Sequence, residues 1–200
     1  MFTGIIEELG QIKKIVEILM GKRFFIAATT LLQGLKIGDS IAVNGTCLTI
    51  TEFNPEGFWV EVVAETLRCS NLGFLTLESQ VNLEPSLTLQ KALGGHLVQG
   101  HVDGVGKILD IQNEGEALLL KVSFPQKLRP YLVSKGYIAM DGMSLTVIEV
   151  TDEYFTLTLI PHTQKITMAG SYRVGQIVNL EGDIMAKYAE NFWAQRSLLA

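Results

Sequence analysis

The strongest constraint on the fold is an internal repeat. Residues 44–52 (NGTCLTITE) align with residues 141–149 (DGMSLTVIE) at an offset of 97. The tetrapeptide VNLE at 81–84 recurs unchanged at 178–181, at the same offset. Because a repeat of this length carries a whole folding unit, the chain is predicted to fold as two similar halves.

A third match places the boundaries of these halves. GIIE at 4–7 aligns with GHVD at 100–103 at an offset of 96, so one residue of slippage in a loop separates the two registers. We therefore predict three parts, which are a first unit over residues 1–95, a second over 96–183 and a tail over 184–200.

Each half has the pattern of short strands. Residues 57–63 and 153–160 alternate in polarity and are rich in β-branched and aromatic side chains, and turn residues at 54–57 and 151–153 precede them. The fold class predicted is all-β, with two tandem homologous six-stranded Greek-key β-barrels, short helices and a C-terminal α-helix.

Short helices are expected at three places. Ser86 is a plausible N-cap for a helix over 87–93, which Gly94 would end. Residues 124–129 also begin like a helix, with a proline in the first turn, and residues 30–33 would be their counterpart in the first half.

The tail has no partner in the first half. Ile184, Tyr188 and Phe192 are spaced by four and form one apolar stripe on a helix. Two interpretations stay open, because this stripe could pack on its own barrel or could form a subunit interface.

Composition excludes several classes of protein. The net charge is −5 and the basic residues are scattered, so a concentrated nucleic-acid-binding face is not expected. No apolar run is long enough to span a membrane, and the N-terminus lacks the pattern of a secretory signal. The two cysteines are too few for a disulfide framework. We expect a cytoplasmic protein with free thiols.

A duplicated unit offers two related pockets, which suits a pair of similar ligands. Cys47 with Thr49, and Ser144 with Thr146, each place two small polar side chains on one face of a strand. Such groups can hydrogen-bond a heterocycle in an otherwise apolar pocket. The alternative for Cys47 is a small buried hydrophobic residue, but recurrence of the motif favours a ligand site.

The segment 94–104 (GGHLVQGHVDG) is the densest cluster of glycine and polar residues. A histidine can exchange a proton near neutral pH, and glycines let a flat ligand approach the backbone. His101 is predicted to be functional, whereas His96 is assigned to the domain junction. No third ligand stands at metal spacing, so no metal is expected.

Residues 160–165 follow a strand and correspond to 63–68. Free backbone groups beyond a strand end could bind the edge of a ligand. His162 is interpreted as a solvated loop residue, and Lys135 as either a surface charge or a ligand contact.

Five segments together resemble one known family. They are MFTGIIE at 1–7, NGTCLTI at 44–50, ETL at 65–67, GGHLVQGHVDG at 94–104 and DGMSLTV at 141–147. In this order they closely resemble riboflavin synthase of the α-chain type, over nearly the whole chain.

The resemblance implies an activity and an assembly. Two molecules of 6,7-dimethyl-8-ribityllumazine would react to give riboflavin and 5-amino-6-(ribitylamino)uracil, without a metal or an organic cofactor. The family forms homotrimers through C-terminal helices, and each active site lies between the N-terminal barrel of one chain and the C-terminal barrel of a neighbour. Association with lumazine synthase is left open.

The resemblance also implies the residues that contact the ligand. In the first barrel they are Gly4, Ile5, Ile6, Cys47, Leu48, Thr49, Glu61, Val62, Val63, Ala64, Glu65 and Thr66. In the second barrel they are Gly100, His101, Val102, Lys135, Ser144, Leu145, Thr146, Ile160, Pro161, His162, Thr163, Gln164 and Lys165.

The implied reaction needs a proton removed from a methyl group of one lumazine and a nucleophile added to the ring of the other. His101 is the candidate for proton transfer, with Ser144, Asp141 and Cys47 as positioning or activating groups. The residues at 2–3 are expected to cover the site. The competing interpretation is a lumazine-binding antenna protein of the same fold, which tends to lose the clusters at 1–4 and 94–101 that this chain keeps.

Overall fold

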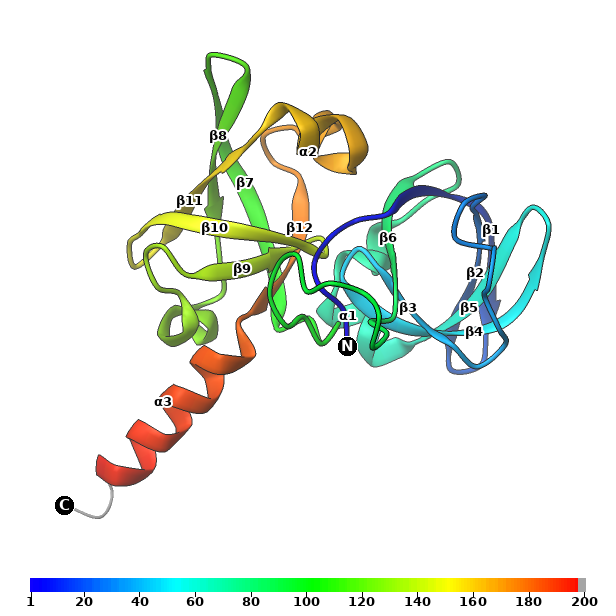
Figure 1. Cartoon of the computed structure of the whole chain (residues 1–200), viewed down its shortest axis with the longest axis horizontal. Coiled ribbons are helices and arrows are strands. Elements are labelled where there is room, and N and C mark those ends of the chain that lie inside the picture. Colours follow the sequence, from blue (N-terminus) through cyan, green and yellow to red (C-terminus); the bar gives the residue numbers. More distant parts are fainter. Residues whose placement is uncertain (198–200) are drawn as a thin grey trace.

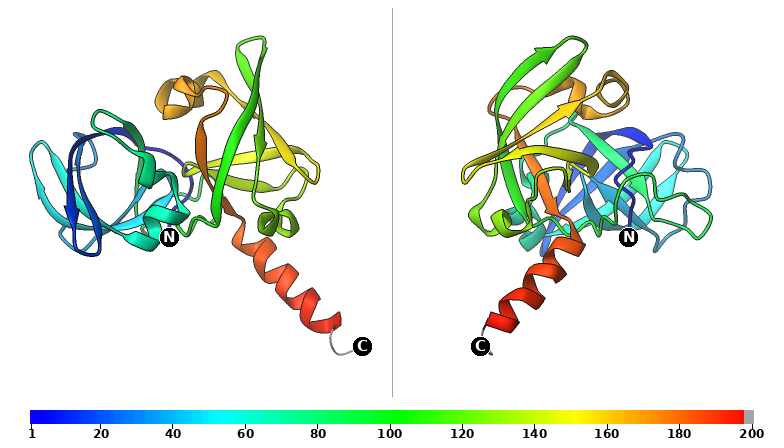
Figure 2. Two further views of the ribbon diagram at one scale, coloured as in Figure 1. Left: turned by 180° about the vertical axis from the view of Figure 1, so that it is seen from behind. Right: turned by 60° about the vertical axis from the view of Figure 1, so that its left-hand side comes forward.

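The computed structural model describes residues 1–197 as two barrels side by side with a helix projecting from the second (Figures 1 and 2). The strands of the first barrel are β1 (Glu8–Ile18), β2 (Gly21–Ala27), β3 (Ser40–Val43), β4 (Thr46–Asn54), β5 (Gly57–Val63) and β6 (Gln80–Pro85). The strands of the second are β7 (Gly104–Glu114), β8 (Ala117–Ser123), β9 (Tyr137–Met140), β10 (Met143–Val150), β11 (Tyr154–Leu159) and β12 (Ile177–Gly182).

Both barrels have the same topology. The first runs β1-β2-β5-β4-β3-β6 and closes where β1 pairs with β6. The second runs β7-β8-β11-β10-β9-β12 and closes where β12 pairs with β7. The irregularities that bend the long strands also recur, on β1 and β4 and again on β7 and β10. The prediction of two six-stranded barrels is confirmed.

The two cores repeat as well. Phe24 and Phe58 fill the first barrel, and Leu120 and Phe155 hold the equivalent positions in the second, all without exposed surface. Alternation along each strand directs these side chains inward, so each half buries its own core.

Short helices follow the fifth strand of each barrel. They are α1 (Ala64–Cys69) with the 3-10 turn η1 (Asn71–Phe74), and α2 (Pro161–Ile166) with η3 (Met168–Ser171). His162 lies in α2, so its interpretation as a loop residue is wrong, although its side chain is exposed as expected. The helix expected at 124–129 is the 3-10 helix η2 (Gln126–Tyr131).

Two expected helices are absent from the described part of the chain. Residues 87–93 form turns, since the backbone N–H of Leu87 donates to Met1 and Leu89 is fully exposed, so no apolar face is buried. Residues 30–33 form a turn whose entry is held by Glu8, because its carboxylate accepts from the backbone N–H groups of Thr29 and Leu31.

An approximate two-fold axis relates the two barrels, and equivalent turns of both meet close to it. The turns Asn44-Gly45 and Asp141-Gly142 have positive φ at both residues, the geometry of tight hairpin turns. A Cβ on Gly45 would lie 2.6 Å from the backbone nitrogen of Gly142, so the two turns pack backbone against backbone. Only glycine fits there.

Two buried asparagines form hydrogen bonds between the two barrels. Asn82 donates to the carbonyl of Asp141 and accepts from the N–H of Met168. Asn179 donates to the carbonyl of Asn44 and accepts from the N–H of Asn71. The same side chain of each repeat therefore makes the same pair of bonds to the other barrel.

The tail forms α3 (Ile184–Ser197), which projects away from the second barrel (Figure 1); residues 198–200 of the predicted tail lie outside the described residues. Met185, Tyr188 and Phe192 are 60–68% exposed. Beyond its first turn the helix therefore does not pack its apolar stripe on its own barrel, and the first of the two interpretations of the tail is wrong. Within residues 1–197, no helix has the length and apolar character needed to cross a membrane.

Candidate functional site

The structure contains two pockets at equivalent places in the repeat. The first-barrel pocket, about 280 Å³, is lined by Thr46, Cys47, Glu65, Thr66, Cys69, Ser70, Gly100, His101 and Val102. The second-barrel pocket, about 250 Å³, is lined by Gly4, Ile5, Ile6, Met143, Ser144, Leu145, His162, Thr163, Ile166 and Thr167. Each pocket combines the start of a strand, a short helix and a glycine-containing loop.

The loops are crossed between the barrels. Residues 4–6 of the first half line the second-barrel pocket, and residues 100–102 of the second half line the first-barrel pocket. The prediction that each loop contacts a ligand in the barrel of its own half is therefore wrong for the pocket linings. The crossing starts at an antiparallel bridge between Phe2 and Val98, where the two segments pass each other.

Matching hydrogen bonds fix the crossed loops to the opposite barrel. The backbone N–H of Ser144 donates to the carbonyl of Gly4 over 2.8 Å, and that of Cys47 donates to the carbonyl of Gly100 over 2.9 Å. Both glycines have positive φ. A Cβ on either would lie within 2.6 Å of the facing side chain, so these glycines permit the close approach.

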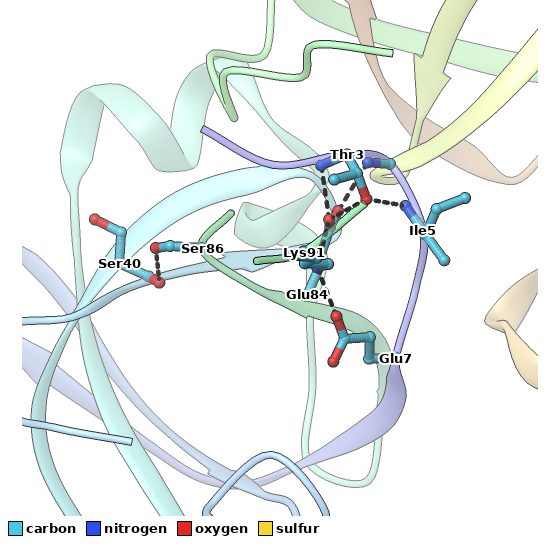
Figure 3. Close-up of polar contacts among 8 residues, drawn as sticks. Thr3, Ile5, Glu7, Ser40, Glu84, Ser86 and Lys91 are labelled. Atoms are coloured by element: carbon cyan, nitrogen blue, oxygen red, sulfur yellow. Dashed lines mark hydrogen bonds and ion pairs between the residues drawn. The ribbon is translucent and has the colours of Figure 1, made fainter. Parts of the chain in front are cut away.

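A buried glutamate accepts hydrogen bonds from the backbone of each crossed loop, and the first of them is Glu84. Glu84 accepts from the backbone N–H groups of Thr3 and Gly4 at 2.7 and 2.9 Å, and from the Thr3 hydroxyl (Figure 3). Phe2 is fully buried among Ala42, Val98 and Ala139. Phe2 and Thr3 are therefore buried between the two barrels next to the crossed loops. The expectation that they cover the site is wrong.

The first-barrel pocket contains two thiols and two titratable side chains. Cys47 lies on β4, whereas Glu65 and Cys69 lie on α1. Glu65 accepts from Arg68 and from the Cys69 thiol, and the hydrogen bond from Arg68 is the main cause that lowers the pKa of Glu65. The same contact with Glu65 raises the pKa of Cys69, which favours the neutral thiol. His101 lines this pocket and is exposed.

The second-barrel pocket contains a hydroxyl paired with a buried imidazole. The Nδ1 atom of His96 lies 2.7 Å from the Ser144 hydroxyl. His96 is only 6% exposed and stacks on Tyr137 with the ring centroids 5.1 Å apart. Burial lowers the pKa of His96, with a smaller opposing effect of Asp183, so the imidazole is neutral at neutral pH. Assigning His96 only to the domain junction therefore missed its contact with Ser144.

Asp141 lies outside both pockets, in the interface between the barrels. Its carboxylate accepts from the Tyr172 hydroxyl at 2.6 Å, from Asn71 at 2.8 Å and from the backbone N–H of Asn179 at 2.7 Å. Complete burial raises its pKa to about 7, against these hydrogen bonds, which lower it. Its counterpart in the first half is the neutral Asn44.

The remaining predicted contacts fall into two groups. Those that line a pocket are Gly4, Ile5, Ile6, Cys47, Glu65, Thr66, Gly100, His101, Val102, Ser144, Leu145, His162 and Thr163. Those that line neither are Leu48, Thr49, Glu61, Val62, Val63, Ala64, Lys135, Thr146, Ile160, Pro161, Gln164 and Lys165. Leu48 and Val62 belong to the first core, so only their backbone could reach a ligand. Contact of any of these residues with a ligand stays a prediction.

A larger groove of about 680 Å³ lies between the barrels. Its lining includes Gln11, Asn71, Phe74 and Gln176 but none of the predicted site residues. It contains neither a thiol nor an imidazole, so the two smaller duplicated pockets are the better candidates for a reaction that moves protons.

Comparison with known proteins gives the family. A family model described as lumazine binding domain matches residues 3–86 and again residues 99–183. The riboflavin synthase of Actinobacillus pleuropneumoniae is 45% identical over 192 residues, which cover 96% of this chain and 89% of that protein. The chain belongs to the riboflavin synthase family. The two family-model matches coincide with the two barrels and begin at the crossed loops.

Further members of the riboflavin synthase family match over similar lengths. The riboflavin synthase of Schizosaccharomyces pombe is 42% identical, covering 95% of this chain and 92% of that protein. The riboflavin synthase of Bacillus subtilis is 40% identical, and the match covers 96% of this chain and 89% of that protein. A crystal structure of LumP complexed with riboflavin has a TM-score of 0.85 at 24% identity, covering 91% of this chain and 99% of that one. At this identity the structural likeness shows the shared fold.

Proposed function

We propose that this chain, as an enzyme of the riboflavin synthase family, converts two molecules of 6,7-dimethyl-8-ribityllumazine into riboflavin and 5-amino-6-(ribitylamino)uracil. The observation that carries this proposal is the pair of pockets with the same construction in the two barrels. A reaction between two copies of one substrate needs the same binding frame twice, and the repeat supplies it. Holding both rings in a reactive orientation supplies much of the rate.

Each pocket takes one ring system. Cys47 and Ser144 stand at the same position of the repeat, and each faces a glycine loop whose backbone is already oriented. Thr66 and Thr163 add hydroxyls from the two short helices. Hydroxyl and backbone groups of this kind match the nitrogens and carbonyls of a pteridine ring.

The pockets act as half-sites of an assembly. At about 250 and 280 Å³ they are smaller than typical ligand pockets of about 300–1000 Å³, which fits a site that a second surface completes. The exposed side chains of Met185, Tyr188 and Phe192 on α3 suit contact with other copies of the chain. We therefore favour a homotrimer in which the first-barrel pocket of one subunit faces the second-barrel pocket of a neighbour.

Proton removal is assigned to the second-barrel pocket. The Nδ1 atom of His96 lies within hydrogen-bond distance of the Ser144 hydroxyl, which reaches the pocket, and the tautomer that carries its proton on Nε2 accepts from Ser144. Ser144 then relays a proton from the ring methyl group of the bound lumazine to His96, the role of a general base. The substrate that loses this proton supplies the carbanion that attacks the other ring.

The first-barrel pocket holds the ring that is attacked. Cys47 and His101 line it, and His101 can return a proton to the substrate at that side. Asp141 acts as a positioning residue, since it joins the barrels and lines neither pocket. Association with lumazine synthase and a cytoplasmic location stay predictions.

The test is to mix purified protein with 6,7-dimethyl-8-ribityllumazine and to follow the absorbance of riboflavin. The proposal expects one riboflavin and one aminouracil for every two lumazines consumed. Binding of lumazine without turnover would instead support the antenna function. Absence of both binding and product would refute the enzyme and the antenna proposals together.

A further inference from the structure

Each crossed loop is held by a lysine in addition to its glutamate. In the first half, Lys91 Nζ lies 3.1 Å from the buried carboxylate of Glu84 and also pairs with Glu7 (Figure 3). Lys91 belongs to the turns after β6, and Glu7 lies directly beyond the loop 4–6. The ion pairs raise the pKa of Lys91 even though burial lowers it, so the lysine is charged throughout the physiological range.

The second half has a related arrangement, in which the lysine comes from a different element. Glu181 accepts from the backbone N–H groups of Gln99, Gly100 and His101 at 2.7–2.9 Å. Lys187 Nζ lies 2.7 Å from Asp103, directly beyond the loop 100–102. Asp103 also accepts from the backbone N–H of Gly182.

The lysines hold similar but not equivalent places. Glu7 and Asp103 correspond in the repeat at an offset of 96. Lys91 follows Glu84 by seven residues, whereas Lys187 follows Glu181 by six. In both pairs the lysine is about one fifth exposed, at 22% and 19%, so water screens the charges only partly. We call these two groups the first clamp (Glu7, Glu84, Lys91) and the second clamp (Asp103, Glu181, Lys187). In the first clamp the lysine pairs with both acids, and in the second Lys187 pairs with Asp103 while Glu181 holds the loop through backbone hydrogen bonds.

We propose that Lys91 and Lys187 are positioning residues, and that each controls ligand binding in the pocket of the opposite barrel. The first clamp fixes residues 4–6, which line the second-barrel pocket. The second clamp fixes residues 100–102, which line the first-barrel pocket. The inference rests on the proposed function, since it takes lumazine as the ligand of both pockets.

The two clamps also differ in a way that gives the pockets different control. Lys187 lies in the first turns of α3, whereas Lys91 lies in a segment without helix or strand. Any displacement of α3 therefore moves the second clamp and the first-barrel pocket, but leaves the first clamp in place.

The experiment compares Lys91→Met and Lys187→Met with the control Lys13→Met. The control removes an exposed ion pair to Glu78, and neither Lys13 nor Glu78 lines either pocket. The probe is 6,7-dioxo-8-ribityllumazine, which lacks the reactive methyl groups. Binding is followed by NMR of the methyl groups of Thr66 in the first-barrel pocket and Ile166 in the second. Each titration then reports one pocket.

The expected results are opposite for the two variants. Lys187→Met should weaken binding in the first-barrel pocket about tenfold and change the second less than twofold, and Lys91→Met should do the reverse. Lys187→Arg should restore binding, since it keeps the charge. Equal weakening of both pockets, weakening in the uncrossed order, or no change in either variant would overturn the proposal.

Two controls separate this inference from the proposed function. If wild type and Lys13→Met do not bind the probe at all, the ligand assignment fails and the clamps are not at fault. If a lysine variant does not fold, Glu7→Gln removes the Lys91–Glu7 ion pair and Asp103→Asn removes the Lys187–Asp103 ion pair, each from the acidic partner at the end of the loop. These variants must then show the same crossed pattern, or the proposal is refuted.

Discussion

The two pockets have equivalent frames, yet they differ in the groups that can move a proton. In the second-barrel pocket, the Ser144 hydroxyl is paired with the buried His96. In the first-barrel pocket, the equivalent Cys47 stands beside an exposed His101. Two equivalent frames that carry different proton-transfer groups suit a reaction in which two identical substrates take different roles, one losing the carbon atoms that the other gains.

The largest effect is expected from removing the imidazole of the second pocket. His96→Gln should lower kcat about 100- to 1000-fold, because the Ser144 hydroxyl loses its proton acceptor. Binding of the unreactive analogue should change little, since His96 lies behind Ser144 and does not line the pocket. Steady-state riboflavin formation and titration measure the two quantities. The paired variant is His101→Gln. If that variant lost most of kcat while His96→Gln kept it, the asymmetry would be reversed.

The packing of the two barrels is tested at the turns where they meet, Asn44-Gly45 and Asp141-Gly142. Gly45→Ala should lower the free energy of unfolding by about 3 kcal/mol, because the new Cβ would meet the backbone of Gly142 and φ is positive there. Gly34→Ala is the matched control, with positive φ and open space around it, and should cost about 1 kcal/mol. Chemical denaturation measures both. Equal losses would show that the turns do not pack as described.

The difference between Asn44 and Asp141 predicts a pH dependence. A carboxyl whose pKa rises from 3.8 to about 7 on folding stabilises the fold at low pH, and this stabilisation is lost as the pH rises toward 7. The difference in stability between wild type and Asp141→Asn should therefore change by about 2–3 kcal/mol between pH 5 and pH 8, in favour of the variant at pH 8.

This variant keeps the hydrogen bonds in place. The amide oxygen of an asparagine can accept from Asn71 and from the N–H of Asn179, and its NH₂ group can donate to Tyr172. Thermal unfolding of both proteins between pH 5 and pH 8 measures the difference in stability. If the stabilities of wild type and variant changed with pH in parallel, the prediction would be wrong. Retention of activity would support the positioning role of Asp141 over a catalytic one.

The smallest effect is expected from making the two pockets alike. Cys47→Ser gives the first-barrel pocket the side chain that the second already has, and both groups are small and can hydrogen-bond. kcat and analogue affinity should change less than about threefold, as measured by the same assays. A loss of more than tenfold in kcat would show that the thiol has a specific role in the reaction.

Much of the fold could be predicted because it depends on local pattern and on the repeat. Alternation over residues 57–63 and 153–160 specifies strands, and turns with Asn-Gly and Asp-Gly specify hairpins. The helices α1 and α2 escaped prediction because six residues are too short to show helical periodicity, although Pro161 at the first position of α2 was an available signal. Residues 87–93 looked helical because of a cap and a terminating glycine, but they bury no apolar face.

The number of barrels, the places of most strands and the polar motifs that both halves share all follow from the amino-acid sequence. These properties follow from neighbours along the chain and from comparison of one half with the other. Three further features depend on long-range contacts, namely that the loops cross between the barrels, that His96 reaches Ser144, and that α3 projects away from its own barrel. Such contacts join residues far apart in sequence, such as Gly4 with Ser144 and Cys47 with Gly100, and no local pattern encodes which distant backbone group will accept a given hydrogen bond.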